Sequence, residues 1–213
     1  MIINKKLRII CAGILFLVFN FQFSVLLAKN NSCLEYKIVP SLEIKVPNYE
    51  ISLSQPDKKM DLLHGDVVST LIEEYEITFG AKIVKDGYCV YIKNVTLNIG
   101  YTNFSIQIDK RHDPDSCAFE AIKDHENDHI KAHLSVIDDS MTDIKQAIKD
   151  ASNNILPIFI TDSSKIDSAM NELEYNFQNQ PQIILMRKKL NAEQEIRNKK
   201  VDLNANYLER CEI

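Results

Sequence analysis

The residues of this chain whose types and spacing could do chemistry are His125, Glu126 and His129, within the sequence His-Glu-Asn-Asp-His. On a helix, positions i and i+4 lie one turn apart on the same face, so these two imidazoles can bind one metal ion together. Glu126 follows the first histidine directly and would lie near such an ion without having to bind it. This spacing is the HExxH pattern, in which two histidines hold zinc and the glutamate handles a proton.

The chemistry that this pattern predicts is hydrolysis of a peptide bond. Zinc lowers the pKa of its bound water towards neutrality, and Glu126 would act as the general base that takes the proton. The zinc-bound water would then attack the peptide carbonyl while the metal stabilises the oxyanion. The sequence therefore predicts a zinc metallopeptidase, a hydrolase with Glu126 as its catalytic residue, His125 and His129 as metal ligands and Zn²⁺ as cofactor. The competing interpretation is a solvated helix flank, on which Glu and His only support the helix.

The third metal ligand is left open by the sequence. His133 lies two turns after His125, roughly 12 Å along the helix axis, which is too far for both to bind one ion comfortably. His133 is therefore expected to pack or to support a ligand. A carboxylate from the next predicted helix is one solution, and other histidines are another. The candidates are His64, His112, His133, Glu172 and Glu174.

The motif falls in the segment with the clearest helical periodicity. Asp113 and Pro114 form a helix start signal, because a capping Asp precedes Pro at the first helical position. Apolar residues then recur at helical spacing, which predicts a helix over about residues 114–153. Glu126 lies within or beside the apolar stripe and the two motif histidines lie towards its flank, so a bound ion would be partly shielded from water.

Two further helices and a group of strands complete the prediction. Ser163 or Ser164 caps a helix that runs to about residue 179, and Pro181 opens another from Gln182 towards Lys200. Before the motif, residues 34–54 alternate apolar and polar side chains around two prolines, which is typical of short strands.

Residues 81–109 carry the strongest strand pattern of the chain. The period of two slips at Asn94 and at residues 102–103, which predicts bulges or turns there. The fold class predicted is α+β: a small antiparallel sheet in the N-terminal half, followed by a long HExxH helix and further helices. Residues 29–213 are predicted to form a single domain, strand-rich over 29–112 and helical over 113–213.

The N-terminus predicts export. Lys5, Lys6 and Arg8 precede an almost wholly apolar stretch over residues 9–27, and a small residue, Ala28, follows. This layout predicts a signal peptide over residues 1–28 and a periplasmic or secreted protein. The apolar stretch is long for a signal peptide, so an uncleaved membrane anchor is the alternative. Contact with a membrane is expected only through this segment.

Four cysteines follow the apolar segment: Cys33, Cys89, Cys117 and Cys211. An even set in an exported chain predicts two disulfide bonds. The pairing preferred is Cys89 with Cys117 and Cys33 with Cys211, the first joining a strand to the main helix and the second joining the chain ends. Four buried reduced thiols are the alternative.

The charge of the chain limits its partners. A formal net charge of −5 argues against nucleic acid as the main partner, because a polyanion needs a basic surface. A peptide or protein substrate fits the predicted chemistry. The alternative function is a non-catalytic exported protein, an envelope-associated binding or assembly module that uses its charged helices for contact with a partner. An exported metal-storing or metal-sensing protein would use the histidines without needing Glu126.

The sequence SCAFEAIKDHENDH, which follows a predicted strand, resembles secreted bacterial HExxH proteins described as predicted zinc-dependent proteases. The likeness covers about residues 85–140, and only HENDH with the preceding Cys117 is specific. It implies a zincin-like fold with the ligand and base roles given above, and a substrate bound as an added strand along residues 101–109. The metzincin pattern fails, because its Gly and His positions hold Ala132 and Ser135.

Overall fold

The computed structural model describes residues 33–56, 64–203, 209 and 211. The predicted signal peptide, residues 1–28, lies outside the described residues. In the described part of the chain, no helix has both the length and the apolar character that crossing a bilayer requires.

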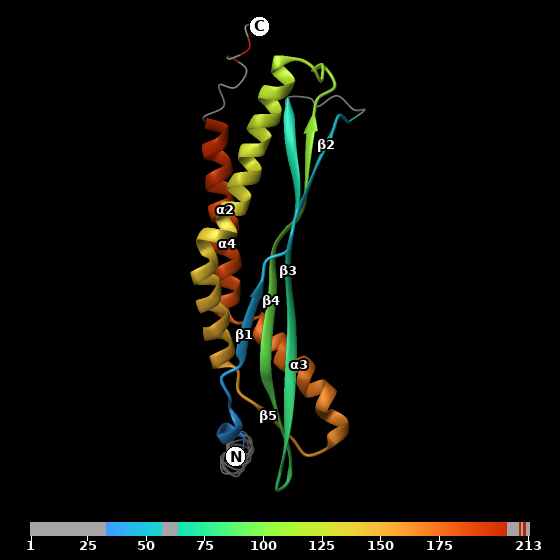
Figure 1. The fold of residues 1–213 in the computed structure, drawn as a ribbon. Coiled ribbons are helices and arrows are strands. Elements are labelled where there is room, and N and C mark those ends of the chain that lie inside the picture. The colour runs from blue at the N-terminus through green and yellow to red at the C-terminus, as the bar shows by residue number, and fades with distance from the viewer. Residues whose placement is uncertain (1–32, 57–63, 204–208, 210, 212–213) are drawn as a thin grey trace, which may run out of the picture.

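A long hairpin forms the centre of a five-stranded sheet. Strand β3 (Gly65–Val84) pairs antiparallel with β4 (Gly87–Ile108) along its whole length. Three short strands pair with the other edge of β4. Of these, β1 (Ser41–Lys45) and β2 (Glu50–Ser54) run parallel to β4, whereas β5 (Ile158–Ile160) runs antiparallel. The result is a narrow, elongated mixed sheet (Figure 1).

The prediction of an antiparallel sheet is therefore wrong for β1 and β2. A period of two reports a half-buried strand but says nothing about the direction of its neighbour. Here β3 reverses the chain between β2 and β4, so β2 and β4 run the same way. The expectation of an edge at residues 101–109 is also wrong, because this part of β4 lies between β3 and β2. Strand β5 joins the sheet from the helical half and was not predicted.

The apolar face of β4 is confirmed as the core. Its side chains at alternate positions are at most 4% exposed: Val90, Ile92, Val95, Leu97, Ile99, Tyr101, Phe104, Ile106 and Ile108. The register with β3 shifts between Thr78 and Phe79 and again between Thr70 and Leu71. These irregularities lie opposite the predicted slips at Asn94 and residues 102–103. Each one restores the apolar side chains that follow to the buried face.

The motif helix, α2 (Cys117–Asn154), begins three residues later than predicted. Its N-cap is Ser116, whose hydroxyl accepts a hydrogen bond from the backbone N–H of Phe119. Asp113 instead caps the preceding turn, where its carboxylate accepts from the N–H of Asp115. Both side chains are good caps, and the choice between them depends on where the chain leaves the sheet.

The other helices agree with the prediction to within a few residues. Helix α3 (Ile166–Gln178) follows a 3₁₀ turn, η2 (Ser163–Lys165), and α4 is Pro181–Leu203; a further 3₁₀ turn, η1, is Leu34–Tyr36. Helices α2 and α4 lie side by side along the sheet (Figure 1). Helix α4 buries Ile183, Met186 and Leu190, and α3 packs Phe177 edge-on against Tyr75 of β3.

Two disulfide bonds are present, as predicted, but the cysteines are paired differently from the preferred arrangement. Cys33 bonds to Cys89, and Cys117 bonds to Cys211. Cys33 meets Cys89 because β1, which follows η1, runs alongside β4. Cys211 meets Cys117 because α4 runs back along α2 towards its start. Both reasons are tertiary, so spacing along the chain could not have supplied them.

Candidate metal centre

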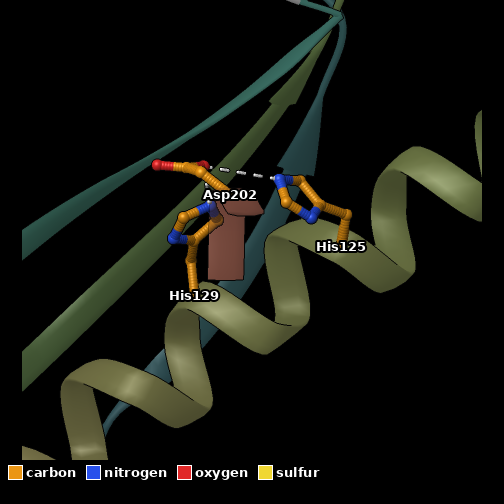
Figure 2. A group of neighbouring side chains, drawn as sticks. All are labelled: His125, His129 and Asp202. Carbon is orange, nitrogen blue, oxygen red and sulfur yellow. Dashed lines mark ion pairs between the residues drawn. The ribbon is translucent and has the colours of Figure 1, made fainter. Parts of the chain in front are cut away.

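His125 and His129 project from α2 towards α4, one helical turn apart (Figure 2). Their ring centroids are 4.8 Å apart and their planes are nearly perpendicular, at 84°. The side chains are only 11% and 14% exposed. Burial and the neighbouring His129 lower the pKa of His125, which favours the neutral imidazole that a metal requires. The predicted pairing of these two histidines on one helix face is thus present.

A third donor comes from the last turn of α4. Oδ1 of Asp202 lies 3.1 Å from Nε2 of His129 and 3.8 Å from Nε2 of His125. One ligand atom from each of the three residues lies within 4.8 Å of the others. Among the residues that the structure describes, this is the single group of three or more His, Cys, Asp or Glu side chains with such convergence. The Asp202 side chain is 61% exposed, which leaves one side of the group open to solvent.

None of the candidates that the sequence offered for the third ligand belongs to this group. Glu172 and Glu174 lie on α3, which packs near Tyr75. Tyr75 is ten residues along β3 from Gly65, a strand distance of roughly 33 Å, and Gly65 lies next to Glu126. The carboxylate that lies beside the two histidines, Asp202, therefore belongs to α4 and not to α3.

The remaining predicted ligands have other partners. His64 and His112 face each other, with 3.0 Å between Nδ1 of the first and Nε2 of the second. His133 is 6% exposed and packs against Tyr101 with ring centroids 5.1 Å apart and planes tilted by 46°, so its expected packing role is confirmed.

Sequence reasoning missed Asp202 because 73 positions separate it from His129 and no motif connects them. One signal could have pointed to it. Gln194, Asn198 and Asp202 recur at i+4 spacing on a helix whose earlier inward positions are apolar. A helix face that changes from apolar to polar along its length can enter a polar site.

Glu126 lies on the sheet side of α2 and is 4% exposed. A Cβ added at Gly65 of β3 would be 2.6 Å from a carboxyl oxygen of Glu126 and 2.6 Å from a methyl group of Ile122, so a larger residue here would force these side chains to shift. Burial raises the pKa of Glu126 to about 7, and the negative charges of Asp66 and Asp202 add to the effect. A carboxyl group with such a pKa can accept and return a proton near neutral pH.

In the metal-free protein, Glu126→Gln is expected to increase stability at alkaline pH. The folded-state pKa lies above the ordinary value of 4.5, so the native carboxyl group is favourable below pH 4.5 and becomes a cost as pH rises through 7. Urea unfolding in EDTA should show a gain of roughly 2–3 kcal/mol at pH 8 but less than about 1 kcal/mol at pH 5. Glu172→Gln, at an exposed position, is the control. Equal gains at both pH values would contradict the burial argument.

A polar network lies beside the two motif histidines. Oδ1 of Asn198 lies 3.3 Å from Nδ1 of His129, and Nδ2 of Asn198 lies 3.1 Å from Nε2 of His133. Nδ1 of His133 is in turn 3.3 Å from the hydroxyl of Ser69 on β3. On the same face of α4, Gln194 accepts a hydrogen bond of 2.9 Å from the hydroxyl of Tyr101. The network connects both helices and the sheet beside the metal-ligand candidates.

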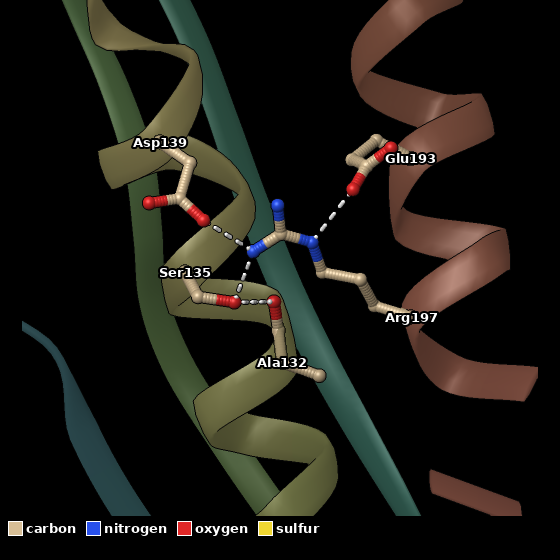
Figure 3. Close-up of polar contacts among 5 residues, drawn as sticks. All are labelled: Ala132, Ser135, Asp139, Glu193 and Arg197. Atoms are coloured by element: carbon tan, nitrogen blue, oxygen red, sulfur yellow. Dashed lines mark hydrogen bonds and ion pairs between the residues drawn. The ribbon is translucent and has the colours of Figure 1, made fainter. Parts of the chain in front are cut away.

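Arg197 fixes α4 against α2 near Asp202 (Figure 3). Its guanidinium donates to the hydroxyl of Ser135 at 2.6 Å and to the carboxylate of Asp139 at 2.8 Å, both on α2. It also donates to Glu193 on its own helix at 2.9 Å. Two hydrogen bonds from one guanidinium nitrogen to neighbouring side chains of α2 restrict sliding of one helix along the other. The register they set is the one that brings Asp202 opposite the two histidines.

Comparisons of the chain with protein-family models, with curated proteins and with solved structures gave no match. The resemblance to secreted HExxH proteases therefore stays a prediction. What the chain can do chemically follows from the geometry of His125, His129, Asp202 and Glu126.

Proposed function

We propose that this chain is an exported zinc-dependent peptidase in which His125, His129 and Asp202 hold the metal and Glu126 is the general base. The observation that carries the proposal is the convergence of the three donors from α2 and α4, with a buried carboxyl group one residue from the first histidine. A zincin-like arrangement and a hydrolytic reaction are parts of this proposal.

The donor set fits zinc. Catalytic zinc sites commonly use three protein ligands of nitrogen and oxygen type and keep one position open. Two donors about 2.1 Å from a tetrahedral ion are about 3.3 Å apart, close to the 3.1 Å between His129 and Asp202. His125 is more widely spaced, at 3.8 Å from Asp202, and would have to move inward.

The amide of Asn198 adds a second argument for a cation. The oxygen of Asn198 faces Nδ1 of His129, and in the tautomer that matches this contact Nδ1 carries the proton and Nε2 directs a lone pair towards Asp202. A lone pair and a carboxylate oxygen at this distance repel each other unless a proton or a cation lies between them. A divalent metal ion satisfies both donors.

The roles of the residues follow from their positions. Bound zinc would supply a Lewis acid and would lower the pKa of water at its open position. Glu126 takes a proton from the attacking water and returns it to the leaving amine of the cleaved peptide. Its burial against Gly65 keeps this carboxyl group in one place and raises its pKa towards the operating pH.

The edge of β3 is the part of the sheet best suited to hold an extended substrate. In the described part of the chain β3 pairs only with β4, and Gly65 and Ser69 contact the site residues Glu126 and His133. Residues 67–72 are uncharged, with Val68 half exposed, whereas Glu73, Glu74 and Glu76 follow. Charged edges resist an added strand and uncharged ones accept it.

Two disulfide bonds support an oxidising compartment, in agreement with the predicted periplasmic or secreted location. The alternative is a non-catalytic envelope-associated binding or assembly protein. It does not account for the burial of the Glu126 carboxyl group. A buried carboxyl group with a strongly raised pKa destabilises a fold, and such groups are concentrated at active sites.

Metal analysis of the oxidised protein tests the proposal. We expect about one zinc per chain, and an affinity that falls roughly a hundredfold in Asp202→Ala because a ligand is removed. Glu172→Ala is the matched control, since this carboxylate is exposed on α3 and was a ligand candidate from the sequence alone. A wild-type protein that binds no zinc, or an equal loss of affinity in both variants, would refute the assignment.

A further inference from the structure

Asn198 contacts a ligand candidate and a buried histidine at the same time. Its amide group lies between His129 and His133, which are one turn apart on α2, although Asn198 itself belongs to α4. A single side chain of α4 therefore contacts two imidazole rings of α2.

An asparagine suits this place because its two amide atoms have opposite roles. The Oδ1 atom lies 3.3 Å from Nδ1 of His129 and the Nδ2 atom 3.1 Å from Nε2 of His133, so the amide pairs with both rings when Nδ1 of His129 carries the proton and Nε2 of His133 accepts. His133 then carries its proton on Nδ1, from which it donates to the hydroxyl of Ser69. In this set of tautomers each atom from Ser69 to His129 has a complementary neighbour, and Nε2 of His129 is the nitrogen left to bind a metal.

We propose that Asn198 is a positioning residue, which holds the ring of His129 so that Nε2 is directed at the metal position beside Asp202. This inference rests on the proposed zinc site. Hydrogen bonds to the second ring nitrogen fix the tautomer and orientation of metal-bound histidines and raise the basicity of the ligand. Asn198 and Asp202 are one turn apart on α4, so a single helix supplies a ligand and orients another.

The proposal makes a distinction between two neighbouring amides. Gln194, one turn before Asn198, approaches both ring nitrogens of His133 at 3.5 Å and accepts from Tyr101, but the structure gives it no hydrogen bond to His129. Loss of Gln194 should disturb the packing of His133 without changing the direction of Nε2 of His129. Loss of Asn198 should disturb the packing of His133 and also change the direction of Nε2 of His129.

Zinc affinity and unfolding by urea, measured on the same full-length oxidised proteins, test this distinction. Asn198→Leu should weaken zinc binding by roughly 10–100-fold, while Gln194→Leu should leave it within about twofold of wild type. Asn198→Asp should restore most of the affinity. The carboxylate accepts from Nδ1 of His129 as the amide oxygen does. His133 can then donate from Nε2 to the other carboxylate oxygen, because the Ser69 hydroxyl can rotate and donate to Nδ1 of His133.

A metal-free measurement separates this inference from the proposed function. The side-chain ¹⁵N resonances of His129 in the zinc-free protein should move in Asn198→Leu and stay in place in Gln194→Leu. If the wild type binds no zinc but these resonances respond, Asn198 positions His129 and the zinc proposal falls. If the wild type binds zinc with an affinity that Asn198→Leu does not change, the zinc proposal stands and the positioning role is overturned.

Discussion

Replacement of Glu126 by glutamine is expected to slow peptide hydrolysis by roughly a thousandfold, while zinc stays bound. Gln has nearly the same size and can occupy the space beside Gly65, but it cannot take a proton from water. General acid–base groups contribute about 10²–10⁴-fold to rate. The measurement is cleavage of a quenched fluorogenic peptide library by the oxidised protein with zinc present, together with the zinc content of each sample.

Glu120→Gln is the matched control for this variant. It makes the same chemical change on the same helix, at an exposed position whose carboxylate contacts Lys123. The control should keep the full rate of hydrolysis. Equal rates in wild type and Glu126→Gln would exclude Glu126 as the base. If Glu126→Gln also lost its zinc, the carboxyl group would have to be counted among the ligands.

Because burial of the carboxyl group is unfavourable, the same variant is also expected to be the more stable one above pH 7 in the absence of metal. A substitution that removes activity and raises stability is typical of an active-site residue. A residue kept for packing would give the opposite result. The two measurements on one variant therefore distinguish an enzyme from a structural protein.

Removal of the Cys117–Cys211 disulfide is expected to have the largest effect on stability. The bond joins residues 94 positions apart, and closing a loop of this size stabilises a fold by about 4.7 kcal/mol in the chain-entropy account. It also restrains the chain that follows Asp202 relative to the start of α2, which carries His125. The double variant Cys117→Ala, Cys211→Ala should therefore unfold at lower urea concentration and bind zinc more weakly.

The second disulfide provides the control for this coupling. Cys33 and Cys89 are 56 positions apart, so their removal should cost a similar amount of stability, about 4 kcal/mol. This bond joins the residue before η1 to β4 and involves neither α2 nor the chain after α4. Zinc affinity at a temperature where both variants are folded should fall only for the Cys117 and Cys211 pair. A parallel loss of affinity in both would show that general destabilisation is the cause.

Several features of the fold could be predicted from local pattern. The buried face of β4 is confirmed, together with irregular pairing at the two slips of its period. The motif helix and the two later helices are also where the helical spacing predicts them. Period and capping are properties of a few neighbouring residues, so the sequence contains them directly.

Other features depend on contacts between distant residues. The parallel direction of β1 and β2, the pairing of the disulfides and the origin of the third donor all follow from how the chain returns on itself. The prediction of an antiparallel sheet failed because alternation is the same in both kinds of sheet. The prediction of Glu172 or Glu174 as ligand failed because it assumed that the next helix would be the one beside α2.

The sequence by itself determined that His125 and His129 share one face of a helix and that Glu126 lies next to them, because helix geometry alone relates positions i and i+4. Only the tertiary structure decided that Asp202 and Asn198 join them, because the antiparallel packing of α4 on α2, with Arg197 bound to Ser135 and Asp139, sets which residues of the two helices meet.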